Sequence, residues 1–183
     1  MERSTIIAGF GGQGILFAGK VLAQAALLEG REVLWIPSYG PEMRGGTASC
    51  TVIIADRPIG SPIVDRADGA VVLNPPSMAK YAPVVAASGI LVVNTTLIEA
   101  EAGRDDIDVV EVPCTALAKR AGDDKMVSIV ALGALVGRAG LVRREMVHQA
   151  LPIVLGPSKA ALVDADVAAF DAGYEAGLER VIA

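Results

Sequence analysis

Apolar residues along this chain fall into two kinds of run, and the order of the runs predicts an α/β fold. Short, almost continuous apolar runs are typical of strands buried on both faces of a sheet, and they lie at 5–8, 32–36, 47–55, 69–74, 90–94 and 109–113. Runs with helical spacing lie between and after them, at 15–28, 75–86, 114–121, 125–138, 143–151 and from 157 onward. Strands that alternate with helices predict a Rossmann-like, three-layer α/β/α sandwich.

The run at 47–55 predicts a strand that runs antiparallel to its neighbour in the sheet. It alternates in part between apolar and polar residues, and a turn at 56–58 follows it. The simplest arrangement makes it an antiparallel neighbour of 32–36, so we expect a mixed but mostly parallel sheet. A chain of 183 residues has the size of one domain, and we assign residues 1–183 to it.

The last helical run carries an apolar stripe and two glycines. The stripe has steps of three and four residues, as a helix buried on one side requires, and consists of Val163, Val167, Phe170, Tyr174, Leu178 and Val181. Gly173 and Gly177 stand one turn apart on the same helix. Glycine inside a helix costs about 1 kcal/mol relative to alanine. We therefore expect these two glycines to allow close contact with another element, either of this chain or of a partner subunit.

Composition and charge narrow the class of protein. The residues are 52% hydrophobic and only 4% aromatic, which predicts a core of Ala, Val, Ile and Leu. The formal net charge is -5 and no dense cluster of Lys and Arg is present, so we expect no nucleic-acid binding. The longest uncharged apolar run, Met126–Gly137, has 12 residues, whereas a membrane span needs about 20. The chain is therefore expected to be cytoplasmic, without contact with a membrane.

Two cysteines, Cys50 and Cys114, lie far apart in the sequence and form no CxxC pair. Two isolated thiols cannot hold an iron–sulfur cluster or a structural zinc without ligands from elsewhere. Both cysteines fall in or just after apolar runs, so we expect them to be buried in the core. We predict no metal site in this chain.

A glycine-rich turn at residues 9–14, with the sequence GFGGQG, joins the first predicted strand to the first predicted helix. Such a turn presents backbone N–H groups at a helix N-terminus, where they can receive a phosphate, a carboxylate or the backbone of a partner. We take Gly11, Gly12, Gln13 and Gly14 as candidate cofactor-binding residues. The alternative is a turn that serves only the packing of the helix on the strand.

The same turn has the Gly-x-Gly-x-x-Gly spacing of a dinucleotide site, and this hypothesis can be tested further along the chain. A dinucleotide site places an acid at the end of the second strand, about 20 residues later, to bind the ribose. The strand at 32–36 is followed by Pro37 and Ser38, with neither an acid nor an Arg, and Glu29 and Glu32 stand at its opposite end. A free-standing nucleotide-binding oxidoreductase is therefore kept only as an alternative.

A second unusual segment, at residues 37–47, follows that strand with the sequence PSYGPEMRGGT. Its prolines and glycines exclude regular structure, and its position at the end of a strand places it beside the glycine turn, where α/β sheets bind ligands. Arg44 offers a planar fork for a carboxylate or phosphate, and we add Ser38 and Tyr39 to it as candidate cofactor-binding residues. The alternative is a surface loop in which Glu42 and Arg44 form an exposed ion pair.

No catalytic group emerges from the sequence. His148, the only histidine, lies within a predicted helix and away from both glycine-rich segments. No Ser-His-Asp, Cys-His or paired-carboxylate arrangement can be assembled. We therefore predict no catalytic residue in this chain.

The glycine turn and the following loop together resemble the gamma subunit of 2-oxoacid:ferredoxin (acceptor) oxidoreductases. GFGGQG at 9–14 and PSYGPEMRGG at 37–46 carry the resemblance, and IGSP at 59–62 and MVSIVALGA at 126–134 agree with it, so that it covers nearly the whole chain. The loop is most similar to that of the 2-oxoglutarate branch, with the branched-chain 2-oxoacid branch close behind. The chain also resembles domain III of the single-chain pyruvate:ferredoxin oxidoreductase.

The resemblance implies a supporting subunit of an enzyme. In this family a 2-oxoacid, coenzyme A and oxidised ferredoxin give an acyl-CoA, carbon dioxide and reduced ferredoxin. The resemblance further implies that alpha, beta and delta or ferredoxin-like subunits hold the thiamine diphosphate, Mg and iron–sulfur clusters, and that ferredoxin binds through the complex. This chain would bind no cofactor alone, but would support assembly and the coenzyme A side of the active site. A purely structural subunit is the alternative, and exposed apolar surface would let the isolated chain form a homodimer.

Overall fold

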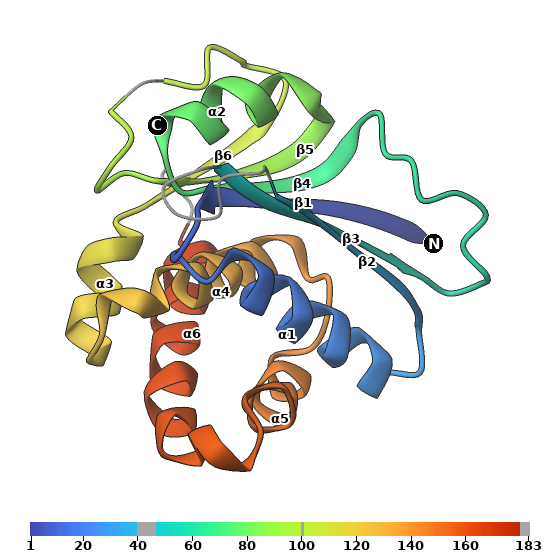
Figure 1. Cartoon of the computed structure of the whole chain (residues 1–183). Helices are drawn as coiled ribbons and strands as arrows, with labels where there is room; N and C mark the ends of the chain where they lie inside the picture. The colour runs from blue at the N-terminus through green and yellow to red at the C-terminus, as the bar shows by residue number, and fades with distance from the viewer. Residues whose placement is uncertain (40–46, 100, 180–183) are drawn as a thin grey trace.

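A mixed β-sheet forms the middle layer of the molecule (Figure 1). The computed structural model describes residues 1–39, 47–99 and 101–179. Within these residues, six strands lie in the order β2-β3-β1-β4-β5-β6. They are β1 (Glu2–Phe10), β2 (Glu32–Tyr39), β3 (Thr47–Ala55), β4 (Ala67–Val72), β5 (Val85–Asn94) and β6 (Asp108–Val112).

Strand β3 runs against the other strands of the described sheet. It pairs antiparallel with both β1 and β2, whereas β1, β4, β5 and β6 form parallel pairs. The predicted mixed, mostly parallel sheet is confirmed, and so is the antiparallel pairing of the second and third strands. All strands except β3 therefore end at the same edge of the sheet, the edge that carries the glycine turn.

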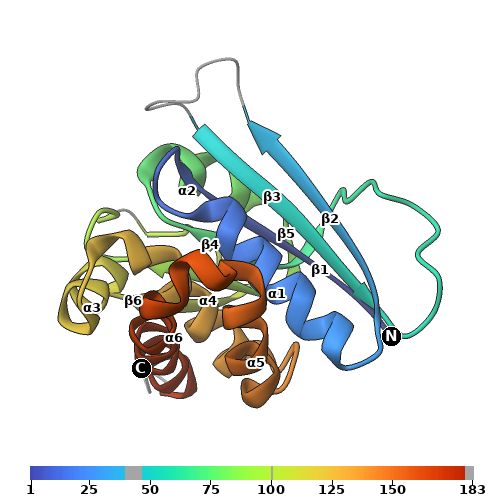
Figure 2. The ribbon, with the colours of Figure 1, turned by 60° about the horizontal axis from the view of Figure 1, so that its bottom comes forward.

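Helices cover both faces of the sheet, but unequally. On one face lie α1 (Ile15–Leu28), α4 (Val127–Ala139), α5 (Arg144–Leu155) and α6 (Val163–Leu178), and Figure 2 shows this layer in front. On the other face lie α2 (Pro75–Tyr81) and the 3-10 turn η1 (Ala82–Val84), and α3 (Cys114–Ala121) packs beside α4 and α6. The predicted three-layer α/β/α sandwich is confirmed.

Side chains of the central strands alternate between two apolar cores. Ile7, Val71 and Val92 belong to the core on the side of α1 and α4, whereas Ile6 and Leu91 belong to the core on the side of α2. Successive strand residues point to opposite faces, and both faces are covered. These strands therefore read as continuous apolar runs in the sequence.

Three predicted helix boundaries are wrong, and each lies near a proline. The helix expected at 143–151 continues through Pro152 and ends at Leu155. The helix expected at 75–86 ends at Tyr81, because Pro83 lacks the N–H that would continue it. The last helix does not start at the proline after Gly156. A 3-10 turn, η3 (Pro157–Leu162), comes first, and the non-helical backbone of Lys159 (φ −120°) separates it from α6.

Helices α4 and α6 touch through glycines on both sides. Cβ atoms added at Gly173 and Gly177 of α6 would overlap backbone atoms of α4, and Cβ atoms added at Gly133 and Gly137 of α4 would overlap backbone atoms of α6. The predicted close contact of the two α6 glycines is confirmed, and the contact lies within this chain.

This close approach corrects the predicted apolar stripe of α6. Phe170 is fully buried as expected, but Leu178 is 51% exposed, and Val181 lies outside the described residues. The stripe members that are only partly buried are Val163, Val167 and Tyr174. The positions that are buried are Asp166, Ala169, Phe170, Gly173 and Gly177. Two helices this close leave no room for large side chains between them, so small residues form the contact and larger ones lie at its flanks.

Candidate functional site

The glycine turn leaves β1 at the common strand edge and leads directly into α1. Gly12 (φ 98°) and Gly14 (φ 78°) adopt left-handed backbone conformations that side-chain-bearing residues rarely adopt. Gln13 closes the turn from within, because its Oε1 accepts a hydrogen bond from the Phe10 N–H at 2.6 Å and its own N–H donates to the Phe10 carbonyl at 3.2 Å. The turn is therefore a defined structure held by its own residues.

The first turn of α1 is not capped by a side chain. Gly14 occupies the N-cap position and cannot supply the acceptor that Ser or Asp would give there. The orphan N–H groups of this helix end carry a partial positive charge, and such helix ends bind anions. A Cβ at Gly14 would lie 2.6 Å from the Ser128 Oγ of α4, so the glycine also lets α1 and α4 approach each other.

Two buried asparagines fix the neighbouring strand ends. Asn94, at the end of β5, donates to the Leu73 carbonyl at 3.4 Å and to the Thr115 Oγ1 at 3.1 Å. Asn74, just after β4, accepts a hydrogen bond from the Ser77 N–H at 2.8 Å and so caps α2. Sequence reasoning missed both asparagines, although each directly follows an apolar run. They stabilise the ends of β4 and β5 at the same sheet edge that carries the glycine turn.

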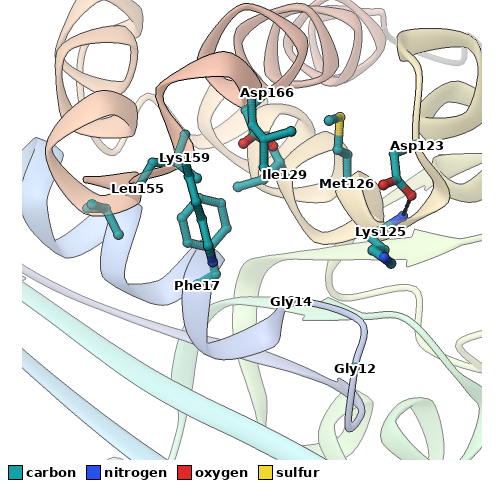
Figure 3. Close-up of a pocket in the computed structure, with 12 residues that line it drawn as sticks. Gly12, Gly14, Phe17, Asp123, Lys125, Met126, Ile129, Leu155, Lys159 and Asp166 are labelled. Atoms are coloured by element: carbon teal, nitrogen blue, oxygen red, sulfur yellow. Dashed lines mark hydrogen bonds between the residues drawn. The ribbon is translucent and has the colours of Figure 1, made fainter. Parts of the chain in front are cut away.

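Two hollows meet at the glycine turn. The first, of about 280 Å³, lies between the turn, Phe17 and the helical layer (Figure 3). The second, of about 230 Å³, is lined by Gln13, Thr115 and their neighbours. Gly12 and Lys125 line both hollows, and Lys125 is exposed. Sequence reasoning missed Lys125, because only the fold brings the 3-10 turn η2 (Asp124–Met126) next to residues 9–14.

The structure brings part of the predicted site together. Gly12, Gln13 and Gly14 line the hollows, and Gly11 belongs to the same turn. Ser38 is exposed on β2, which β3 separates from β1. Of the two other candidates, only the backbone of Tyr39 is described, where it pairs with Ala48, and Arg44 lies outside the described residues.

The two glycine-rich segments are close at one described pair. Thr47, the first residue of β3, is the antiparallel partner of Phe10 in the sheet. The rest of the predicted proximity falls on residues 40–46, which lie outside the described residues.

His148 has a structural environment. Its Nε2 lies 2.7 Å from the Asp171 Oδ1, which also accepts a hydrogen bond from the Arg144 Nε at 2.8 Å. Burial acts to raise the pKa of Asp171, but the hydrogen bonds from Arg144 and His148 outweigh it and lower that pKa. The imidazole also packs edge-on against Phe170, with ring centroids 5.8 Å apart. These contacts join α5 to α6, away from the glycine turn.

The cysteines are buried, as expected. Burial raises the pKa of the Cys50 and Cys114 thiols to about 12, so neither is a nucleophile at neutral pH.

Within residues 1–39, 47–99 and 101–179, no group of three His, Cys, Asp or Glu side chains is placed to hold a metal ion. In the same part of the chain, none of the helices combines the length and apolar character that crossing a membrane requires.

Comparison with known proteins gives matches along nearly the whole chain. The family model for pyruvate ferredoxin/flavodoxin oxidoreductase matches residues 4–176. The ketoisovalerate oxidoreductase subunit VorA of Methanothermobacter thermautotrophicus is 38% identical over 96% of this chain and 36% of its own length. This chain therefore spans about a third of that relative.

Two other relatives match from end to end. The 2-oxoglutarate synthase subunit KorC of Methanocaldococcus jannaschii is 32% identical over 98% of this chain and 96% of its own length. The crystal structure of the gamma subunit of a keto/oxoacid ferredoxin oxidoreductase from Geobacter sulfurreducens is 30% identical, with a TM-score of 0.82 over 96% of this chain and 98% of that chain.

Proposed function

Because the chain belongs to the pyruvate ferredoxin/flavodoxin oxidoreductase family, we propose that it is the gamma subunit of a multisubunit 2-oxoacid:ferredoxin oxidoreductase. The observation that carries this proposal is the end-to-end match to separate subunits of such enzymes, in sequence to KorC and in fold to the Geobacter gamma subunit. The complex would convert a 2-oxoacid, coenzyme A and oxidised ferredoxin into an acyl-CoA, carbon dioxide and reduced ferredoxin.

In this proposal the redox and decarboxylation chemistry belongs to partner subunits. Thiamine diphosphate would supply the carbanion chemistry of decarboxylation, and alpha and beta subunits would bind it with Mg. The described residues of this chain offer two buried thiols and no group of metal ligands, which does not fit an iron–sulfur cluster. The clusters are therefore assigned to the other subunits, which also receive the ferredoxin.

We assign this chain to the coenzyme A side of the active site. The left-handed glycines at 12 and 14, the uncapped start of α1 and the exposed Lys125 together suit a phosphate group. In that role the turn would bind and orient coenzyme A without taking part in bond making. Ser38 and Tyr39, at the end of β2, and Arg44 remain proposed contributors.

The 2-oxoacid is proposed from the relatives. KorC, a 2-oxoglutarate synthase subunit, matches this chain over its whole length, so 2-oxoglutarate is the first substrate to test. VorA, a ketoisovalerate oxidoreductase subunit, has the higher identity, so ketoisovalerate is the competing substrate.

The test is purification of the tagged chain from its native cells, followed by assay of the eluate for 2-oxoacid- and coenzyme A-dependent reduction of a viologen dye. We expect thiamine- and cluster-bearing subunits to co-purify with this activity, and the preferred 2-oxoacid identifies the substrate. A chain that purifies alone and binds NADH with micromolar affinity, followed through Trp35 fluorescence, would contradict the proposal and support a nucleotide-binding oxidoreductase. A complex whose turnover is insensitive to substitutions in the glycine turn would leave only a structural role.

A further inference from the structure

The larger hollow beside the glycine turn continues inward as a mostly apolar cavity. Its walls come from α1, α4, α5, η3 and α6, and Figure 3 shows the residues that line it. The apolar residues that line it are Phe17, Met126, Ile129, Val154, Leu155 and Leu162. A volume of about 280 Å³ is enough for a compact organic molecule of low molecular weight.

Asp166 lies among these apolar groups and points into the cavity (Figure 3). The residue is only 5% exposed, although it stands near the start of α6. Among the residues that the structure describes, no hydrogen bond or close ion pair reaches its carboxyl group, and Lys159 acts on it only as a nearby charge. Burial raises the pKa of Asp166 to about 6, with the Asp123 carboxylate acting in the same direction and Lys159 opposing both. At neutral pH the group is therefore mostly ionised, and its oxygens are open to a donor in the hollow.

A carboxylate surrounded by apolar side chains is stabilised when a ligand supplies a hydrogen-bond donor. Lys125 and Lys159 line the cavity but are exposed, and among the described residues neither forms an ion pair of 4.0 Å or less with Asp166. Lys125 suits an anion, because it lines both hollows together with Gly12. Asp166 offers the opposite chemistry, because its carboxylate is an acceptor among apolar side chains.

We propose that this cavity is a binding site for a small apolar molecule with a protonated amine. The ammonium group donates hydrogen bonds to the Asp166 carboxylate, and the apolar body packs against Phe17, Met126 and Ile129. The amine site shares its hollow with the anion site proposed at the glycine turn, since Gly12, Gly14 and Lys125 line the same hollow as Asp166. Occupancy of the cavity does not depend on the assignment of the chain to an oxidoreductase.

The test is isothermal titration calorimetry of the full chain at pH 7.5 with 2-phenylethylamine, 2-phenylethanol and phenylacetate. These probes keep the apolar body and change the head group from cation to neutral donor to anion. We expect one amine per chain, with affinity at least about tenfold higher than for phenylacetate, because a charge-assisted hydrogen bond replaces repulsion. No saturable amine binding, or tighter binding of phenylacetate, would overturn the proposal.

Two variants and a control locate the amine. Asp166→Asn is expected to weaken amine binding about tenfold and to change 2-phenylethanol binding little. Asp164→Asn, an exposed carboxylate in the same helical turn, should leave the amine affinity unchanged. Lys159→Ala should strengthen amine binding, because it removes a like charge from the cavity. Equal amine affinity for Asp166→Asn and the unmodified chain would overturn the assignment of Asp166.

Discussion

Lys125 is exposed where the two hollows meet, next to Gly12. If it contacts a phosphate of coenzyme A, Lys125→Ala should raise the Michaelis constant for coenzyme A about tenfold in the assembled complex, with a smaller effect on kcat. Lys119→Ala, at an exposed lysine of α3, is the matched control and should change neither. Steady-state assays of both variants decide the point, and equal constants for the two would remove Lys125 from the proposed site.

Gln13 stabilises the glycine turn through one acceptor atom, the Oε1 that binds the Phe10 N–H. Gln13→Ala should lower the free energy of unfolding by about 1–2 kcal/mol, because that N–H loses its partner. Gln13→Glu keeps an acceptor at the same place and should lose less. Denaturant unfolding of the two variants compares them directly. A Glu variant as unstable as the Ala variant would show that the acceptor is not what holds the turn.

Asp166 links stability to pH, because burial raises its pKa from 3.8 in the unfolded chain to about 6. Above pH 6 both states are ionised and the folded state carries the full penalty, which fades as the pH falls from 6 toward 3.8. Asp166→Asn should therefore be more stable than the unmodified chain at pH 8, by about 1 kcal/mol once solvent access through the cavity mouth is considered.

The measurement for Asp166 is denaturant unfolding of both proteins at pH 8 and pH 5. The stabilisation by Asn should shrink at the lower pH. Because the comparison is between two proteins at the same pH, the carboxylates with lowered pKa, such as Asp171, cancel from it. A difference that is constant between the two pH values would mean that Asp166 is not the titrating group.

Motifs of adjacent residues in the sequence identified only part of the site. The glycine turn could be predicted because its conformation depends on neighbouring residues alone. Lys125 and Asp166 could not, because 110 or more residues separate each of them from the turn that they face. A buried aspartate also appears in the sequence as one more acid in the first turn of a helix, which is a common exposed position.

At the scale of single elements, the α4–α6 contact depends on its glycines. Gly173→Ala should lower the free energy of unfolding by about 2–4 kcal/mol, because its Cβ would overlap the Val130 carbonyl and force the helices apart. Gly60→Ala is the control, since no atom lies within 4 Å of a Cβ there, and should change stability little. Thermal or denaturant unfolding measures both. A tolerated Gly173→Ala would show that the helices can separate at low cost.

Periodicity predicted the type and order of these elements better than their ends. The central strands were identifiable because both of their faces are covered. The buried side of α6 was predicted from its largest residues, whereas in the structure its smallest residues form the contact with α4. The sequence predicted that Gly173 and Gly177 contact another element. It could not show that this contact turns the small residues of α6, rather than its largest ones, toward α4.

At the scale of the whole molecule, the sequence predicted the layers and the mixed sheet, but not the order of all strands. The position of β3 between β2 and β1 depends on long-range pairing, which no local pattern encodes. That position also places β3 between Ser38 and the glycine turn. Ser38 therefore lies one strand away from the glycine turn, whereas Thr47, at the start of β3, pairs directly with Phe10.

The unequal helical layers have a consequence for synthesis on the ribosome. The strands and α1 are made first, whereas α4, α5 and α6, which cover Ile7, Val71 and Val92, occupy residues 127–178. During translation, one broad apolar face of the sheet therefore stays exposed until the last third of the chain has been synthesised. Such a surface is prone to aggregation and is bound by chaperones, so we expect a nascent chain to need protection until its C-terminal helices have emerged.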